Sequence, residues 1–165
     1  MTRDLANAIQ KELGADIEEI ADPTPRSGPL GYMRCVLESA FQQKAAIRSP
    51  AKNPRDYDLV IVGTPVWAGN MSSPVRAYLS KTRDRLPKVA FFCTMGGVGN
   101  EHTFQKMGEL CQKSPVAELA LRDGVRWKQA RKDIANFAAA AQKAVGRGTT
   151  AAERGDNAPA AFQVS

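Results

Sequence analysis

Two short apolar segments, Asp58–Gly63 (DLVIVG) and Lys88–Thr94 (KVAFFCT), constrain the fold of this chain more than any other feature. Both are rich in β-branched or aromatic residues and show no apolar/polar alternation. Such segments are typical of strands that are buried on both faces of a parallel sheet. We therefore expect a sheet with helices covering both of its sides.

Helical and strand-like segments alternate along the chain. Helical periodicity is present at residues 2–13, 30–47 and 127–143, and further strands are expected at 15–21 and 116–122. Two more helices are expected, one that starts at Ser73-Pro74 and one with Phe104, Met107 and Cys111 on a single face. Strict alternation predicts parallel strands joined by right-handed helical crossovers. In the last helix we expect Trp127, Ile134 and Phe137 to face the core. Residues 146–165 show no periodicity and predict a disordered tail behind one domain of residues 1–145.

Composition excludes several classes of protein. The net charge of +6 is concentrated late in the chain, but no aromatic residues accompany these charges as they would in a specific nucleic-acid platform. The apolar runs are too short for a membrane span, and the polar start does not resemble a secretory signal. Three widely spaced cysteines without a CxxC pair indicate neither a metal site nor a redox dithiol. We expect a cytoplasmic protein.

Two loops of unusual composition follow the two buried strands. The first, Thr64–Asn70 (TPVWAGN), places Trp67 just past a strand end. Its indole either stacks on a flat ligand or folds back onto the core. The second, Thr94–Asn100 (TMGGVGN), contains three glycines in four residues, which either wrap a ligand with free N–H groups or form a flexible connector. Ligands of open parallel sheets bind beyond the carboxyl ends of the strands, where both loops lie.

The segment from Tyr57 to Gly69, followed by Ser73-Pro74-Val75, resembles the third strand and second flavin loop of the flavodoxin family. Residues 89–97 are similar to its fourth strand and third flavin loop. The resemblance covers most of residues 2–143 and implies FMN as cofactor, with Trp67 against the isoalloxazine ring. The implied cofactor-binding residues are Thr64, Pro65, Val66, Trp67, Ala68, Gly69, Thr94, Met95, Gly96, Gly97, Gly99 and Asn100. No catalytic side chain is assigned, since the flavin would perform the chemistry.

The resemblance also implies a three-layer α/β fold with parallel strand order 2-1-3-4-5. Such proteins begin with a strand and a phosphate-binding loop, whereas only Thr2 matches the end of that loop here. We therefore expect strand 1 to be missing and FMN binding to be weakened. A start codon assigned too late, a shortened and non-functional relative, or a strand donated by another chain would each account for this.

The leading functional hypothesis is an FMN-binding redox protein, either an electron carrier or a small FMN-dependent reductase. Its partner would be a redox protein or a nicotinamide cofactor, and a homodimer is one assembly to consider. Electron-carrying flavodoxins are strongly acidic, so the basic charge here departs from that pattern. The alternative hypothesis is a flavin-free flavodoxin-like interaction module that binds a partner protein.

Overall fold

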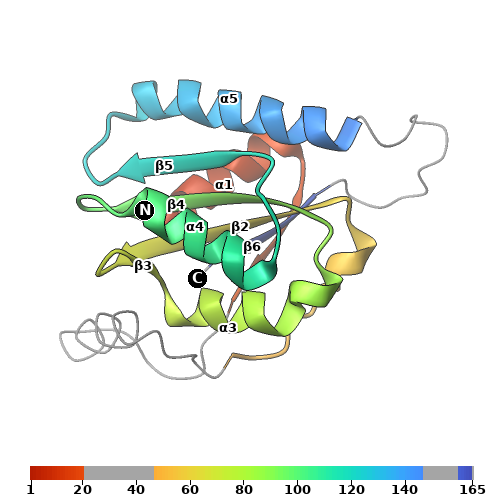
Figure 1. Ribbon diagram of the computed structural model, residues 1–165. Helices are drawn as coiled ribbons and strands as arrows, with labels where there is room; N and C mark the ends of the chain where they lie inside the picture. The colour runs from red at the N-terminus through yellow and green to blue at the C-terminus, as the bar shows by residue number, and fades with distance from the viewer. Residues whose placement is uncertain (21–46, 147–159, 165) are drawn as a thin grey trace.

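A computed structural model describes residues 1–20, 47–146 and 160–164 (Figure 1). The helices among these residues are α1 (Thr2–Leu13), α3 (Ser73–Thr82), α4 (Asn100–Cys111) and α5 (Trp127–Gly146). The strands are β1 (Asp16–Glu19), β2 (Leu59–Trp67), β3 (Asn70–Met71), β4 (Lys88–Met95), β5 (Glu118–Arg122) and β6 (Ala160–Val164). Short 3₁₀ turns occur at Pro54–Asp56 and Arg83–Arg85.

The predicted α/β class and the predicted strands are confirmed. The expected helix at residues 30–47 lies outside the described residues, apart from its last residue, Ile47, which is buried and not helical. Strand β5 lies at an edge of the sheet, as its more alternating sequence indicates.

The sheet has two buried faces, as the sequences of β2 and β4 predict. Leu59 and Ile61 of β2 pack toward α1 and α5, whereas Val60 and Val62 pack toward α3 and α4. This division follows from the two-residue period of a strand. Figure 1 shows α1 and α5 together on one side of the sheet and α3 and α4 on the other, which gives three layers.

The position of strand 1, which was expected to be empty, is occupied by β6. The strand order is β1-β6-β2-β4-β5, and β6 runs parallel to both of its neighbours, with Ile17 and Ile61 each in register with Phe162. This is the order 2-1-3-4-5, with the position of strand 1, between β1 and β2, occupied by a segment from the far end of the chain. The predicted missing strand and the predicted disorder of the tail are therefore wrong for residues 160–164.

Residues 160–164 form a strand because their backbone completes hydrogen bonds with segments far away in the sequence. Strands β1 and β2 flank the same position, and each would leave a row of backbone N–H and C=O groups unpaired without a strand between them. Residues 161–164 of β6 pair with both neighbours, and Ala160 pairs with β2. They satisfy groups that are far away in the sequence, so no local pattern around residue 160 indicates the strand.

Candidate functional site

The loop predicted to follow β2 is largely strand. Strand β2 continues to Trp67 and turns back into β3, with Val66 opposite Met71 and Trp67 opposite Asn70. The two turn residues, Ala68 and Gly69, have φ angles of 47° and 72°. Positive φ at both central positions is the signature of a tight hairpin turn whose twist matches the strands. Trp67 is therefore half-buried near the tip of a hairpin rather than in an irregular loop.

A buried threonine closes the base of this β2–β3 hairpin (residues 59–71). The Thr64 side chain is fully buried. Its hydroxyl donates to the Pro65 carbonyl at 2.9 Å and accepts a hydrogen bond from the Ser72 N–H, also at 2.9 Å. These bonds hold the first turn of α3 against the end of β2, so the direction of the hairpin is determined at its base.

The glycine loop (residues 96–99) leaves the neighbouring strand β4 at the same edge. Thr94 and Met95 are still buried, whereas Gly96, Gly97 and Val98 are exposed. No hydrogen bond from the N–H groups of Gly96, Gly97 or Val98 is present within the described part of the chain. Free backbone donors at the end of a buried strand are suited to the acceptor atoms of a bound ligand.

The hairpin and the glycine loop are in contact. Pro65 and Thr94 are in register on adjacent parallel strands, so Trp67 and Gly96 each lie two residues beyond the same point. A Cβ atom placed on Gly99 would lie 2.9 Å from the Gly69 Cα and 3.5 Å from Val66 Cγ1. Gly99 also has a φ of 114°. Only glycine permits both this conformation and this approach of one backbone to the other.

Two polar residues outside the predicted set support the site. The Thr103 hydroxyl of α4 donates to the Gly69 carbonyl at 3.2 Å, which ties the hairpin turn to the helix after the glycine loop. The Asp123 N–H donates to the Met95 carbonyl at 2.8 Å, which fixes the end of β4 to the residue after β5. Sequence reasoning overlooked both, because a helix threonine and a turn aspartate carry no local signal of long-range contacts.

The start of α1 and the end of β6 complete this edge. Thr2, the first residue of α1, lies with its hydroxyl oxygen 2.6 Å from that of Thr94. Val164, the last residue of β6, is in register with Gly63 on β2. The N-terminus of α1 therefore adjoins the same sheet edge as the two loops, and helix N-termini favour negatively charged groups. Figure 1 marks the N-terminus on this side of the sheet.

These contacts bring the twelve predicted residues to one edge of the sheet, where residues 64–70 and 94–100 lie in adjacent segments. The arrangement fits a flat aromatic group with polar rims: an indole at the hairpin, open backbone donors at the glycine loop, and close backbone contact between them. Which atoms touch a ligand stays a prediction.

Other chemistry has little support in the described residues. Burial raises the pKa of the Cys93 thiol to about 12 and also raises that of Cys111, so neither is a reactive thiolate at neutral pH. No group of three metal-ligating side chains occurs in residues 1–20 or 47–146. The helices among the described residues are too short or too polar to cross a bilayer.

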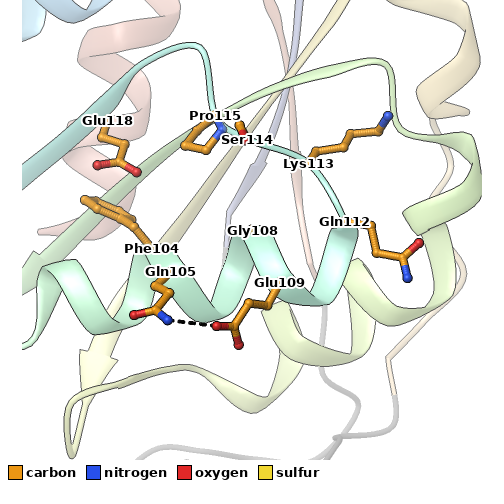
Figure 2. A pocket seen from close by; sticks show the side chains of 9 residues that line it. All are labelled: Phe104, Gln105, Gly108, Glu109, Gln112, Lys113, Ser114, Pro115 and Glu118. Carbon is orange, nitrogen blue, oxygen red and sulfur yellow. Dashed lines mark hydrogen bonds between the residues drawn. The ribbon is translucent and has the colours of Figure 1, made fainter.

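A separate pocket of about 390 Å³ lies at the other end of α4 (Figure 2). Its wall includes Phe104, Glu109 and Lys113, together with Glu118 at the start of β5. Because it adjoins the beginning of β5 and the C-terminal end of α4, it lies away from the strand ends that carry the two loops. Within it, the Gln105 amide donates to the Glu109 carboxylate at 2.8 Å.

Known structures share this architecture. A flavoprotein of Lactobacillus acidophilus NCFM, solved in complex with FMN, is 22% identical over 80% of this chain and 89% of its own, with a TM-score of 0.58. The chain has a flavodoxin-like fold. Candidate flavoproteins of Bacteroides eggerthii DSM 20697 and Bacteroides uniformis ATCC 8492 are 18% and 14% identical, with TM-scores of 0.65 and 0.67. They cover 84% and 83% of this chain and 90% and 89% of theirs. No protein-family model and no curated protein sequence matches the chain.

Proposed function

We propose that this flavodoxin-like chain binds FMN at the edge formed by the β2–β3 hairpin and the glycine loop, and that it acts as a redox protein. One observation carries the proposal: the turn of the hairpin and the glycine loop touch at Gly69 and Gly99. Trp67 and the free N–H donors of the glycine loop therefore lie in adjacent segments beyond the ends of neighbouring strands. The Lactobacillus protein with the same fold was solved in complex with FMN, which supports the choice of cofactor.

Each part of the edge has a distinct role in this proposal. Trp67 borders the isoalloxazine ring, and the N–H groups of Gly96 and Gly97 face its polar rim. Thr2 and the first turn of α1 hold the phosphate, because that helix end favours an anion. The flavin supplies the electron-accepting chemistry, and the chain orients it and shields one side from water. A redox protein or a nicotinamide cofactor exchanges electrons with it in the cytoplasm.

The test is a titration of the purified chain with FMN, followed by quenching of flavin fluorescence. Trp67→Ala removes apolar burial of about 1.5–3 kcal/mol, which corresponds to about a tenfold to a hundredfold loss of affinity. Trp127→Ala is the matched control, since the chain has two tryptophans and Trp127 lies on the α5 face. Equal affinity for both variants, or no binding at about 100 μM FMN, would refute the proposal.

A second titration separates the contribution of the phosphate to flavin binding from that of the ring. We expect FMN to bind more tightly than riboflavin, because riboflavin lacks the phosphate. Thr2→Val should weaken FMN binding and leave riboflavin binding unchanged. If both flavins bind equally, the α1 end does not hold the phosphate, although the ring site stands. If neither flavin binds, the alternative hypothesis of a flavin-free interaction module is favoured. Trp67→Ala should then leave the binding of a partner protein intact.

A further inference from the structure

A groove of about 490 Å³ runs between α1 and α5. Ala8 of α1 and Ile134 of α5 contribute apolar surface to it. Ile134 is 2% exposed and belongs to the core between these helices and the sheet. The groove therefore has a rigid apolar base, because the residues beneath it are fixed by core packing.

An exposed tryptophan stands at one end of this α1–α5 groove. Trp127, expected from its helical spacing to face the core, is 49% exposed and lines the groove instead. It is the first residue of α5, and α5 packs on the sheet only from Ala130 onward. Tryptophan is enriched in the buried centres of protein interfaces, where its large surface leaves water. The exposed indole therefore marks this face as a docking surface.

The groove carries charges of both signs. Asp4 and Glu12 lie eight residues apart on one face of α1, whereas Arg131 lies on the α5 wall. Lys11 also lines the groove on the α1 side. Neither Glu12 nor Arg131 forms an ion pair within the described part of the chain, although both are exposed in the same groove. Asp4 pairs with the Met1 amino group at 3.0 Å.

We propose that this groove is the interface of a homodimer with two-fold symmetry. In such an interface the same patch meets itself, so a carboxylate on α1 of one copy can face a guanidinium on α5 of the other. Trp127 of each copy enters the groove of the other, and Glu12 of one copy approaches Arg131 of the second. A partner of one charge sign would leave either Glu12 or Arg131 unmatched. A second copy can match both of these side chains.

The dimensions predict a reversible dimer. Helices of 12 and 20 residues are about 18 and 30 Å long, and packed side by side they present a face on the order of 500 Å². Stable complexes bury about 800 Å² per partner. We therefore expect a dissociation constant in the micromolar range, and the proposal does not depend on flavin binding.

Charge exchange tests the proposal directly. Sedimentation velocity of the full chain from about 1 to 200 μM should show a monomer–dimer equilibrium. Arg131→Glu and Glu12→Arg should each weaken dimerisation at least tenfold, and the double variant should restore it to within about threefold of the wild type. Trp127→Ala should also abolish the dimer. Lys143→Glu, an equal charge change on an exposed α5 residue outside the groove, should leave it unchanged.

Each other outcome overturns the proposal. A wild-type chain that stays monomeric at 200 μM has no such interface. If each single variant weakens dimerisation and the double variant does not restore it, Glu12 and Arg131 do not meet across a two-fold axis. FMN titration of Arg131→Glu separates this result from the flavin proposal, since its flavin affinity should equal that of the wild type. Circular dichroism of each variant verifies the fold.

Discussion

The hydroxyl oxygens of Thr2 and Thr94 lie 2.6 Å apart, and this contact joins the first residue of α1 to the end of β4. The two residues are 92 positions apart in the sequence. Thr94 is 5% exposed, so the bond is shielded from competing water. It fixes the N-terminus of α1 at the edge from which the hairpin and the glycine loop emerge.

Removal of this hydrogen bond should lower stability measurably. A typical intramolecular hydrogen bond contributes about 0.5–1.5 kcal/mol to the free energy of unfolding. We expect Thr2→Val and Thr94→Val each to cost about this amount, and the double variant to cost less than their sum. Urea unfolding of the four proteins measures the coupling energy. Thr94→Ser keeps a hydroxyl and serves as the control; additive losses would show that the two hydroxyls do not interact.

Gly63 of β2 should not tolerate a side chain. A Cβ atom there would lie 2.0 Å from Phe92 Cζ, inside a fully buried ring. Overpacking of this kind costs about 1–3 kcal/mol, so Gly63→Ala should lower the urea midpoint clearly. Gly97→Ala has open space around it and should change stability by less than about 0.5 kcal/mol. Phe92→Leu should recover part of the loss in the Gly63→Ala background, and a Gly63→Ala chain of wild-type stability would contradict the packing.

The hydrogen bonds of Asp16, at the start of β1, should make a pH-dependent contribution to the stability of the fold. Its carboxylate accepts hydrogen bonds from the Tyr57 hydroxyl at 2.7 Å and from the Lys52 ammonium at 2.9 Å. The bond from Tyr57, and then that from Lys52, lower the pKa of Asp16. A lowered pKa stabilises the fold above the ordinary value of about 3.9, and this stabilisation is lost as the pH falls through the folded-state pKa.

Urea unfolding of Asp16→Asn and of the wild type measures this contribution. The variant should have the lower urea midpoint at pH 7, and the difference should shrink below about pH 4, where the wild-type carboxylate becomes protonated. The same contact raises the pKa of Lys52, so its contribution is fully present below about pH 10.4 and is lost as the pH rises through the raised folded-state pKa. Asp84→Asn is the control, because that side chain is 83% exposed. A difference that is constant with pH would exclude the carboxylate as its source.

Strand β6 can be tested through its backbone. Proline at position 161 removes an N–H from a strand that pairs on both sides, and this change leaves an acceptor on a neighbouring strand unsatisfied. We expect Ala161→Pro to cost about 1–3 kcal/mol, whereas Ala161→Ser keeps the N–H and should be close to neutral. Hydrogen exchange adds a direct measurement: the amides of residues 161–164 should be protected in the wild type. Exchange at the rate of an unfolded peptide would place β6 outside the sheet.

The sequence by itself determined the class of the fold and the location of the candidate site. Leu59–Val62 and Val89–Cys93 are so uniformly apolar that they can be stable only between two layers of helices. Parallel strands end at one edge, so the segments after Gly63 and Thr94 had to emerge together. Their contact at Gly69 and Gly99 agrees with this reasoning.

Only the tertiary structure decided where the remaining segments lie. Residues 160–164 (AAFQV) have no strong local preference for a strand, and they form β6 because β1 and β2 offer unpaired backbone groups on both sides. Trp127 has the spacing of a core residue, yet it precedes the part of α5 that reaches the sheet. Periodicity reports which face of a segment is apolar. Which element packs against that face, or pairs with that backbone, is decided by contacts between residues far apart in the sequence. Such contacts leave no local pattern.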